Sequence, residues 1–171
     1  MQISLPDGIS SLPLFPYLQE IHDLLSSHTV LLVQAEPGAG KSTLLPWYLL
    51  EKKEPGEKKI LLLEPRRAAA HAVAERIAYL LGEKPGERVG LRTRHETIVS
   101  DETCLEVVTE GILTRMIQKD QSLEDYDLLI FDEFHERNLQ ADLGLALAWD
   151  MKKNLRPELK IIVMSATLSA I

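Results

Sequence analysis

The sequence of 171 residues contains a single cysteine, Cys104, and few aromatic residues, which make up 5% of the chain. One cysteine cannot form an internal disulfide, so a disulfide-stapled scaffold is excluded and a reducing cytoplasmic location is expected. No apolar run approaches the roughly 20 residues that a membrane-spanning helix needs. Residues 1–7 lack the basic and apolar regions of a signal peptide. The five histidines are scattered and form no cluster with the cysteine, so no zinc site is expected.

Basic residues are a minority, because 19 Lys and Arg face 26 Asp and Glu, and the formal net charge is −7. A uniformly acidic surface would repel nucleic acid, but the charges are segregated along the chain. Residues 58–95 hold nine Lys or Arg against four Glu, whereas residues 101–150 hold thirteen acids against three bases. A phosphate backbone would therefore meet the first segment and avoid most of the second. The alternative is that these charges are solvated helix faces.

Apolar runs alternate with helical patterns along the chain. Strands are expected at residues 29–35, 60–63, 89–94, 104–109, 128–131 and 161–164, and helices at 12–27, 42–53, 66–81, 111–118 and 139–152. Strands that are apolar on both faces and alternate with helices indicate an α/β fold, with a mostly parallel sheet and helices on both faces. The length suits one domain, residues 1–171, in which residues 1–28 form a helical lead-in. Ligands of such sheets bind beyond the carboxyl ends of the strands.

A glycine-rich loop follows the first expected strand. It consists of Pro37, Gly38, Ala39, Gly40, Lys41, Ser42 and Thr43. The loop fits the phosphate-binding pattern G-x-x-x-x-G-K-[ST], except that Ala35 stands for the first glycine. Backbone N–H groups would surround phosphate oxygens, Lys41 would reach the β- and γ-phosphates, and Ser42 would ligate Mg²⁺. The alternative is a chance glycine-rich turn.

Two adjacent acids, Asp132 and Glu133, follow the apolar strand expected at residues 128–131. A carboxylate on Mg²⁺ and a second carboxylate that positions water are what nucleotide hydrolysis needs. Asp132 is therefore assigned to the metal, and Glu133 to the metal site and to the role of general base. A solvated acidic turn is the alternative. Gly111 is interpreted as a tight turn into the helix expected at residues 111–118.

These motifs and three others resemble the first RecA-like domain of the DEAH-box/RHA helicases of superfamily 2. The motifs are Gly-Ala-Gly-Lys-Ser-Thr at 38–43, Glu-Pro-Arg-Arg at 64–67, Thr-Glu-Gly at 109–111, Asp-Glu-Phe-His-Glu-Arg at 132–137 and Ser-Ala-Thr at 165–167. They cover nearly the whole chain in the family's order, and the bacterial HrpB group is the most similar. The resemblance implies a RecA-like P-loop NTPase domain, ATP and Mg²⁺ as cofactors, and an ATP-dependent RNA helicase as the parent protein.

The resemblance also implies a role for several arginines. Arg66, Arg67 and Thr109 would hold the backbone of single-stranded RNA, and both residue types suit phosphate contacts. The alternative is that Arg66 and Arg67 pair with local acids. Arg76 matches the arginine on which family members stack adenine, with a surface helix arginine as the alternative. No aromatic platform lies near Arg66 and Arg67 in sequence, which favours backbone contacts over base readout.

The last implied roles concern coupling between the nucleotide site and movement. His135 matches a residue that links the ATP site to Ser165 and Thr167, which couple hydrolysis to motion between domains. Phe134 stands for the alanine of the DEAH signature, and its ring is expected beside the metal site. The family's second RecA-like domain supplies arginine fingers, which contribute about 10³–10⁵ in rate in related enzymes. Because this second domain is not part of the sequence, residues 1–171 alone are expected to bind nucleotide weakly and to turn over slowly. Residues 168–171 are interpreted as a boundary or the start of a linker.

Two rival functions remain open on the sequence. One is a P-loop NTPase that acts on DNA or protein, such as a translocase. The other is a nucleotide-gated binding module whose partner supplies catalysis in trans, although Glu133 would be dispensable in such a module. The nucleotide that is preferred, the polarity of movement and the oligomeric state are also left open.

Overall fold

The computed structural model describes residues 8–167, so the expectations for residues 1–7 and 168–171 lie outside the described residues. Its core is a seven-stranded sheet with the order β1-β7-β6-β2-β5-β3-β4. The strands are β1 (Val30–Gln34), β2 (Lys59–Glu64), β3 (Val89–Arg92), β4 (Thr97–Ile98), β5 (Leu105–Thr109), β6 (Tyr126–Phe131) and β7 (Lys160–Ser165). Every neighbouring pair is parallel except β3 and β4, which are antiparallel. The expected mostly parallel sheet is confirmed.

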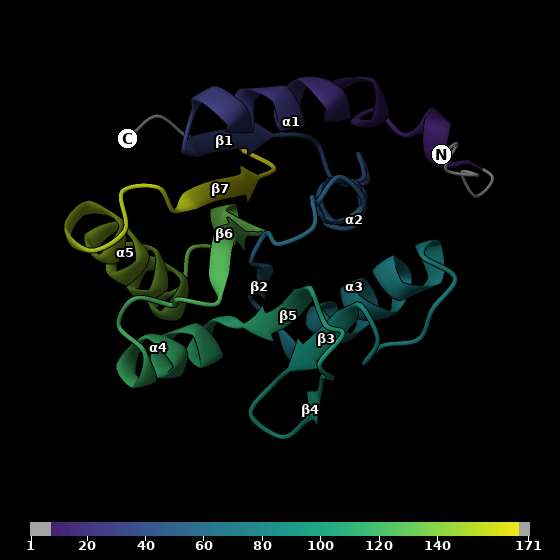
Figure 1. The fold of residues 1–171 in the computed structure, drawn as a ribbon. Helices are drawn as coiled ribbons and strands as arrows, with labels where there is room; N and C mark the ends of the chain where they lie inside the picture. The colour runs from purple at the N-terminus through teal and green to yellow at the C-terminus, as the bar shows by residue number, and fades with distance from the viewer. Residues whose placement is uncertain (1–7, 168–171) are drawn as a thin grey trace.

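Five α-helices cover the two faces of the sheet (Figure 1). The core on one face combines strand residues with α1 (Leu18–Ser27), α2 (Leu44–Glu51) and α3 (Arg67–Leu80). The core on the other face combines strand residues with α4 (Glu110–Lys119) and α5 (Leu139–Asn154). This layering confirms helices on both faces. None of the helices among residues 8–167 combines the length and apolar character needed to cross a bilayer.

Strand β2 shows why the central strands read as continuous apolar runs. Leu61, Leu62 and Leu63 are each 0% exposed. Their side chains alternate between the two faces, since Leu62 belongs to the first core and Leu61 and Leu63 belong to the second. Full burial of a leucine side chain contributes about 1.5–3 kcal/mol, so this short segment is a major source of stability.

The structure corrects the expected start of two helices. The helix expected at residues 12–27 begins only at Leu18, after the 3₁₀ turns η1 (Ile9–Ser11) and η2 (Phe15–Tyr17). Pro13 and Pro16 lie in this stretch, and proline lacks the N–H that a helix interior requires. The helix expected from residue 42 begins at Leu44, because residues 41–43 form turns after Gly40, which has φ +97°.

Two smaller expectations about the middle of the chain are wrong. The strand expected at residues 89–94 ends at Arg92 and turns back into β4, a two-residue strand whose apolar alternation is too short to be recognised. Gly111 does not form a tight turn, because it lies in the first turn of α4 and is not among the glycines with positive φ. A Cβ added to Gly111 would meet nothing within 4 Å.

The parallel strands end together, and this gathers the motifs at one edge of the sheet. Gln34 of β1 pairs with Ser165 of β7, and Glu64 of β2 pairs with Thr109 of β5. Phe131, the last residue of β6, lies opposite Leu63 in β2. The segments that follow these strands therefore meet at the carboxyl edge, where ligands of open α/β sheets bind.

Candidate nucleotide and nucleic-acid site

The loop between β1 and α2 depends on two glycines with left-handed backbone conformations. Gly38 has φ +82° and Gly40 has φ +97°, a region that residues with a Cβ seldom adopt. A Cβ on Gly40 would also lie 3.1 Å from the Leu12 Cδ1 atom and 3.2 Å from the Leu44 Cβ atom. The backbone N–H of Leu14 donates to the Ala39 carbonyl at 3.1 Å. The lead-in before α1 therefore packs directly on the loop.

A small cavity of about 310 Å³ lies against this loop. Its lining includes Gly38, Gly40, Lys41, Ser42, Thr43 and Glu133. The Lys41 side chain is only 4% exposed, and its ammonium lies 3.6 Å from the Glu133 carboxylate. The cavity thus combines a buried cation, two hydroxyl side chains and loop backbone, which is the donor set that phosphate oxygens require.

Asp132 lies at the carboxyl end of β6 with a side chain suited to a cation. One carboxylate oxygen accepts a hydrogen bond from the Glu133 backbone N–H at 2.8 Å. The other oxygen, Oδ2, is buried and has no hydrogen-bond partner among the described residues. A buried unpaired carboxylate oxygen is costly unless something compensates it, and a metal ion or its bound water would do so.

Glu64, at the end of β2, is a buried carboxyl group to which the sequence motifs assign no role. It is 1% exposed. Burial raises the pKa of Glu64 to about 11, and the negative charge expected on nearby acidic groups adds to the rise. The Glu64 carboxyl is therefore neutral near pH 7, so it does not add a second negative charge beside Asp132. The signal in the sequence is a lone acid that ends a buried Leu-Leu-Leu strand.

His135 connects Glu133 to the loop after β7. The backbone N–H of Ala166 donates to Nδ1 of His135 at 3.0 Å. Nδ1 is then the acceptor, so the ring proton is assigned to Nε2, which lies 3.2 Å from the Glu133 carboxylate. The hydroxyl of Ser165 donates to the Thr167 carbonyl at 2.6 Å. A continuous chain of contacts therefore runs from Lys41 through Glu133 and His135 to the Ser-Ala-Thr segment.

Phe134 does not place its ring beside the metal site, and that expectation is wrong. Glu133 adopts a left-handed conformation with φ +52°, and η3 (Phe134–Glu136) follows it as a 3₁₀ turn. The Phe134 side chain packs against the core that α4 and α5 cover. The guanidinium of Arg137 lies 5.5 Å from the centroid of the Phe134 ring. The side chains of Phe134 and Glu133 therefore have different surroundings.

The residues proposed to contact RNA lie at or just after the ends of the neighbouring strands β2 and β5. Arg66 is the N-terminal flanking residue of α3, and Arg67 is its first residue; both are exposed. The Arg66 guanidinium donates to Glu136 at 2.9 Å, so the local pairing considered for Arg66 is present. Arg67 makes no ion pair within residues 8–167. Thr109 precedes α4, and its hydroxyl makes no capping hydrogen bond.

Arg76 is exposed on α3. Its guanidinium lies 5.3 Å from the centroid of the Tyr79 ring, and Tyr79 is 65% exposed. An arginine held against one aromatic face keeps its opposite face available for stacking. This arrangement is compatible with adenine stacking and equally with a surface arginine–tyrosine pair.

A comparison with protein families agrees with this geometry. The family model described as "DEAD/DEAH box helicase" matches residues 17–171. The match covers most of the chain, which therefore belongs to the DEAD/DEAH box helicase family.

Comparisons with individual proteins show which helicases of this family the chain is similar to. The chain is 55% identical over 161 residues to "ATP-dependent RNA helicase HrpB" of Escherichia coli, covering 94% of this chain and 20% of that protein. It is 40% identical over 158 residues to "ATP-dependent RNA helicase HrpA" of Borreliella burgdorferi, covering 92% of this chain and 19% of that protein. The crystal structure of Escherichia coli DEAH/RHA helicase HrpB superposes with a TM-score of 0.87 at 54% identity, covering 93% of this chain and 20% of that structure. The chain thus spans about a fifth of the length of these relatives, and the expected similarity to the HrpB group and the RecA-like fold are confirmed.

Proposed function

We propose that this chain is the ATP-binding half of an ATP-dependent RNA helicase. The observation that carries the proposal is one cavity that brings Lys41 within 3.6 Å of Glu133. The residue before Glu133, Asp132, also has a buried Oδ2 without a hydrogen-bond partner among the described residues. A triphosphate in this cavity would compete with Glu133 for the Lys41 ammonium. Glu133 would then be released to orient and deprotonate the attacking water.

The residues fit a magnesium ion, which would neutralise charge on the β- and γ-phosphates when bound. Ser42 and Asp132 would hold it, with Glu133 nearby, because Mg²⁺ prefers hydroxyl and carboxylate oxygens and retains several waters.

Single-stranded RNA is the proposed nucleic-acid partner, held by Arg66, Arg67 and Thr109. Arg66 would leave Glu136 and pair with a phosphate instead. Breaking the Arg66–Glu136 ion pair would cost little free energy, because the Arg66 side chain is exposed and surface ion pairs contribute at most about 1 kcal/mol. A second RecA-like domain of a longer chain is the other proposed partner, supplying arginine fingers. Coupling between ATP hydrolysis and motion of that domain would pass through His135, Ser165 and Thr167. The Arg76 guanidinium would stack on adenine. A cytoplasmic location is also part of the proposal.

The test measures ATP affinity and steady-state ATP hydrolysis by residues 1–171, each with and without single-stranded RNA. Lys41→Ala provides the blank, and Lys119→Ala, at an exposed position on α4, is the matched control. We expect nucleotide binding that Lys41→Ala abolishes and Lys119→Ala retains, with turnover close to the blank because the proposed arginine fingers belong to a second domain. Unchanged nucleotide affinity in Lys41→Ala would contradict the loop assignment.

The full-length protein separates the rival functions. Stimulation of its ATPase by single-stranded RNA over DNA would support the RNA assignment, whereas stronger stimulation by DNA would favour a DNA translocase. Hydrolysis that rises only when a separate protein is added would favour the nucleotide-gated module.

A further inference from the structure

The turn formed by residues 133–136 carries an acid at each end, and each acid is paired with a cation. The Glu133 carboxylate lies 3.6 Å from the Lys41 ammonium, and the Glu136 carboxylate lies 2.9 Å from the Arg66 guanidinium. The proposed function assigns Lys41 to a nucleotide phosphate and Arg66 to an RNA phosphate. Each acid of the turn therefore holds a cation that a phosphate would have to take from it.

The two ends of this turn are joined directly. The backbone N–H of Glu136 donates to the Glu133 carbonyl at 3.0 Å. An oxygen of the Glu133 carboxylate and one of the Glu136 carboxylate lie within 4.8 Å of each other. Two like charges at this separation repel, and the ion pairs with Lys41 and Arg66 offset that repulsion. A ligand that removes one cation therefore changes the balance of forces on the other acid as well.

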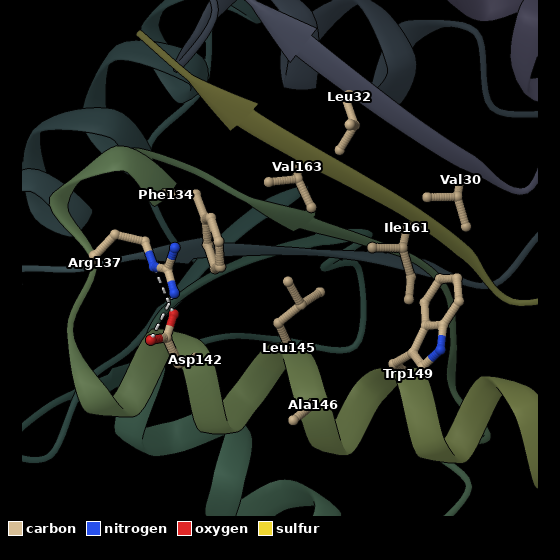
Figure 2. Close-up of a pocket in the computed structure, with 10 residues that line it drawn as sticks. All are labelled: Val30, Leu32, Phe134, Arg137, Asp142, Leu145, Ala146, Trp149, Ile161 and Val163. Carbon is tan, nitrogen blue, oxygen red and sulfur yellow. Dashed lines mark hydrogen bonds and ion pairs between the residues drawn. The ribbon is translucent and has the colours of Figure 1, made fainter. Parts of the chain in front are cut away.

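The backbone of the turn is strained at both ends. Glu133 has φ +52° and Arg137 has φ +37°, and such conformations persist only where surrounding contacts hold them. After the turn, the Arg137 guanidinium donates to Asp142 at 3.0 and 3.2 Å (Figure 2). This contact involves neither cation assigned to a phosphate, so it can stay in place when phosphate binds. The pairs made by Lys41 and Arg66 are the restraints on the turn that phosphate would break.

The two pairs differ in how easily a ligand can reach them. The Arg66 side chain is 67% exposed, whereas the Lys41 side chain is 4% exposed. An exposed ion pair biases an equilibrium by no more than about fivefold, so an RNA phosphate arriving from solvent can displace Glu136. Glu133 leaves Lys41 only when a ligand enters the cavity beside the loop. The Arg66–Glu136 pair is therefore the restraint that opens first.

We propose that Glu136 is a positioning residue that competes with RNA for Arg66 and, while paired, holds the turn that keeps Glu133 on Lys41. This inference rests on the proposed function for the phosphate contacts of Arg66 and Lys41. An RNA phosphate on Arg66 frees Glu136, and the freed turn lets Glu133 leave Lys41 more readily when ATP enters. Because such coupling is reciprocal, ATP that releases Glu133 also weakens the hold of Glu136 on Arg66.

The test compares Glu136→Gln with a matched control in the full-length protein. The control is Glu124→Gln, because the Lys58–Glu124 pair is also exposed and also has a distance of 2.9 Å. Lys58 and Glu124 precede β2 and β6, at the amino end of the strands and away from the site. Fluorescence anisotropy with labelled oligouridine measures RNA affinity without nucleotide. Steady-state kinetics measures kcat/KM for ATP without RNA and with saturating RNA.

We expect Glu136→Gln to bind RNA about two- to fivefold more tightly than the parent. Its kcat/KM for ATP without RNA should rise by about the same factor, because a restraint can bias the turn by no more than its own strength. With saturating RNA it should match the parent, so the stimulation by RNA becomes smaller. Glu124→Gln should match the parent throughout. A merely structural role of Glu136 would instead weaken both RNA binding and turnover.

Arg66→Ala provides a second variant that separates the restraint from the RNA contact. It should raise kcat/KM without RNA even though it weakens RNA binding, and adding it to Glu136→Gln should give no further rise. In a parent that RNA stimulates, unchanged or weaker RNA binding by Glu136→Gln, or unchanged or lower turnover without RNA, would overturn this inference alone. A parent whose ATPase RNA does not stimulate would overturn the proposed function and this inference together.

Discussion

Replacing Gly40 with alanine should destabilise the chain more than the same change at Gly38. Both glycines have positive φ, +82° at Gly38 and +97° at Gly40, so each substitution is expected to cost about 1–2 kcal/mol in backbone strain. At Gly38 the new methyl group meets nothing within 4 Å. At Gly40 it lies 3.1 Å from Leu12 and 3.2–3.3 Å from Leu44, and such overpacking adds about 1 kcal/mol or more. The expected losses are therefore about 1–2 kcal/mol for Gly38→Ala and about 2–3 kcal/mol for Gly40→Ala.

Urea unfolding of residues 1–171, followed by circular dichroism, measures both values. A double-mutant cycle with Leu12→Ala then separates strain from the contact, because removing the Leu12 side chain relieves one of the two close approaches at Gly40. We expect a coupling of about 0.5–1 kcal/mol between Leu12→Ala and Gly40→Ala, and none between Leu12→Ala and Gly38→Ala. Equal losses at the two glycines, or strict additivity with Leu12→Ala at both, would refute the packing of the lead-in on the phosphate loop.

Three further predictions concern catalysis, RNA binding and pH. Glu133→Gln in the full-length protein should retain ATP binding and lose turnover by about 10²-fold or more, and unchanged hydrolysis would remove Glu133 as the base. Replacing Arg66 and Arg67 together by alanine should weaken RNA binding and make its salt dependence shallower by about two phosphate contacts, whereas an unchanged slope would assign both residues to local structure. Burial raises the pKa of Glu110, so the neutral form is favoured in the folded state and this contribution to stability is lost as pH rises above about 4.5. Glu110→Gln should therefore gain stability relative to the parent as pH rises from 4.5 to 8 in urea unfolding, more than the exposed control Glu102→Gln; parallel curves would contradict this.

The layers of the fold could be predicted from the sequence, because a strand that is buried on both faces appears as a continuous run of apolar residues. A run such as Leu61-Leu62-Leu63 can only be a central strand or a buried helix, and its short length and the following Pro65 decide for a strand. Strand order follows less directly, since β2 pairs with β5 and β6 rather than with its neighbours in sequence. The motifs still predict that their strands end together, and the paired positions of Glu64 and Thr109 agree.

The errors have two sources, one in the local sequence and one in tertiary neighbours. Leu14 and Leu18 have helical spacing, but the prolines at 13 and 16 hold the chain in 3₁₀ turns until α1 begins. Glu64 reads as an ordinary strand-end acid, and its raised pKa depends first on burial and then on acidic groups such as Asp132, which follows β6 and lies far away in sequence. A pKa of this kind depends on tertiary neighbours, which neither composition nor spacing reveals.

The segment at residues 132–137 shows how one continuous motif can serve two surfaces. The left-handed conformation of Glu133, at φ +52°, is followed by a single 3₁₀ turn, so successive side chains have separate environments. The carboxylate of Glu133 contacts Lys41 and His135, while the Phe134 ring lines an apolar groove between α5 and strands β1 and β7. A ligand that displaces Glu133 from Lys41 would therefore act on backbone torsions that also position the Phe134 ring. This shared backbone offers a physical route by which the nucleotide cavity can influence the surface beside α5 without direct contact.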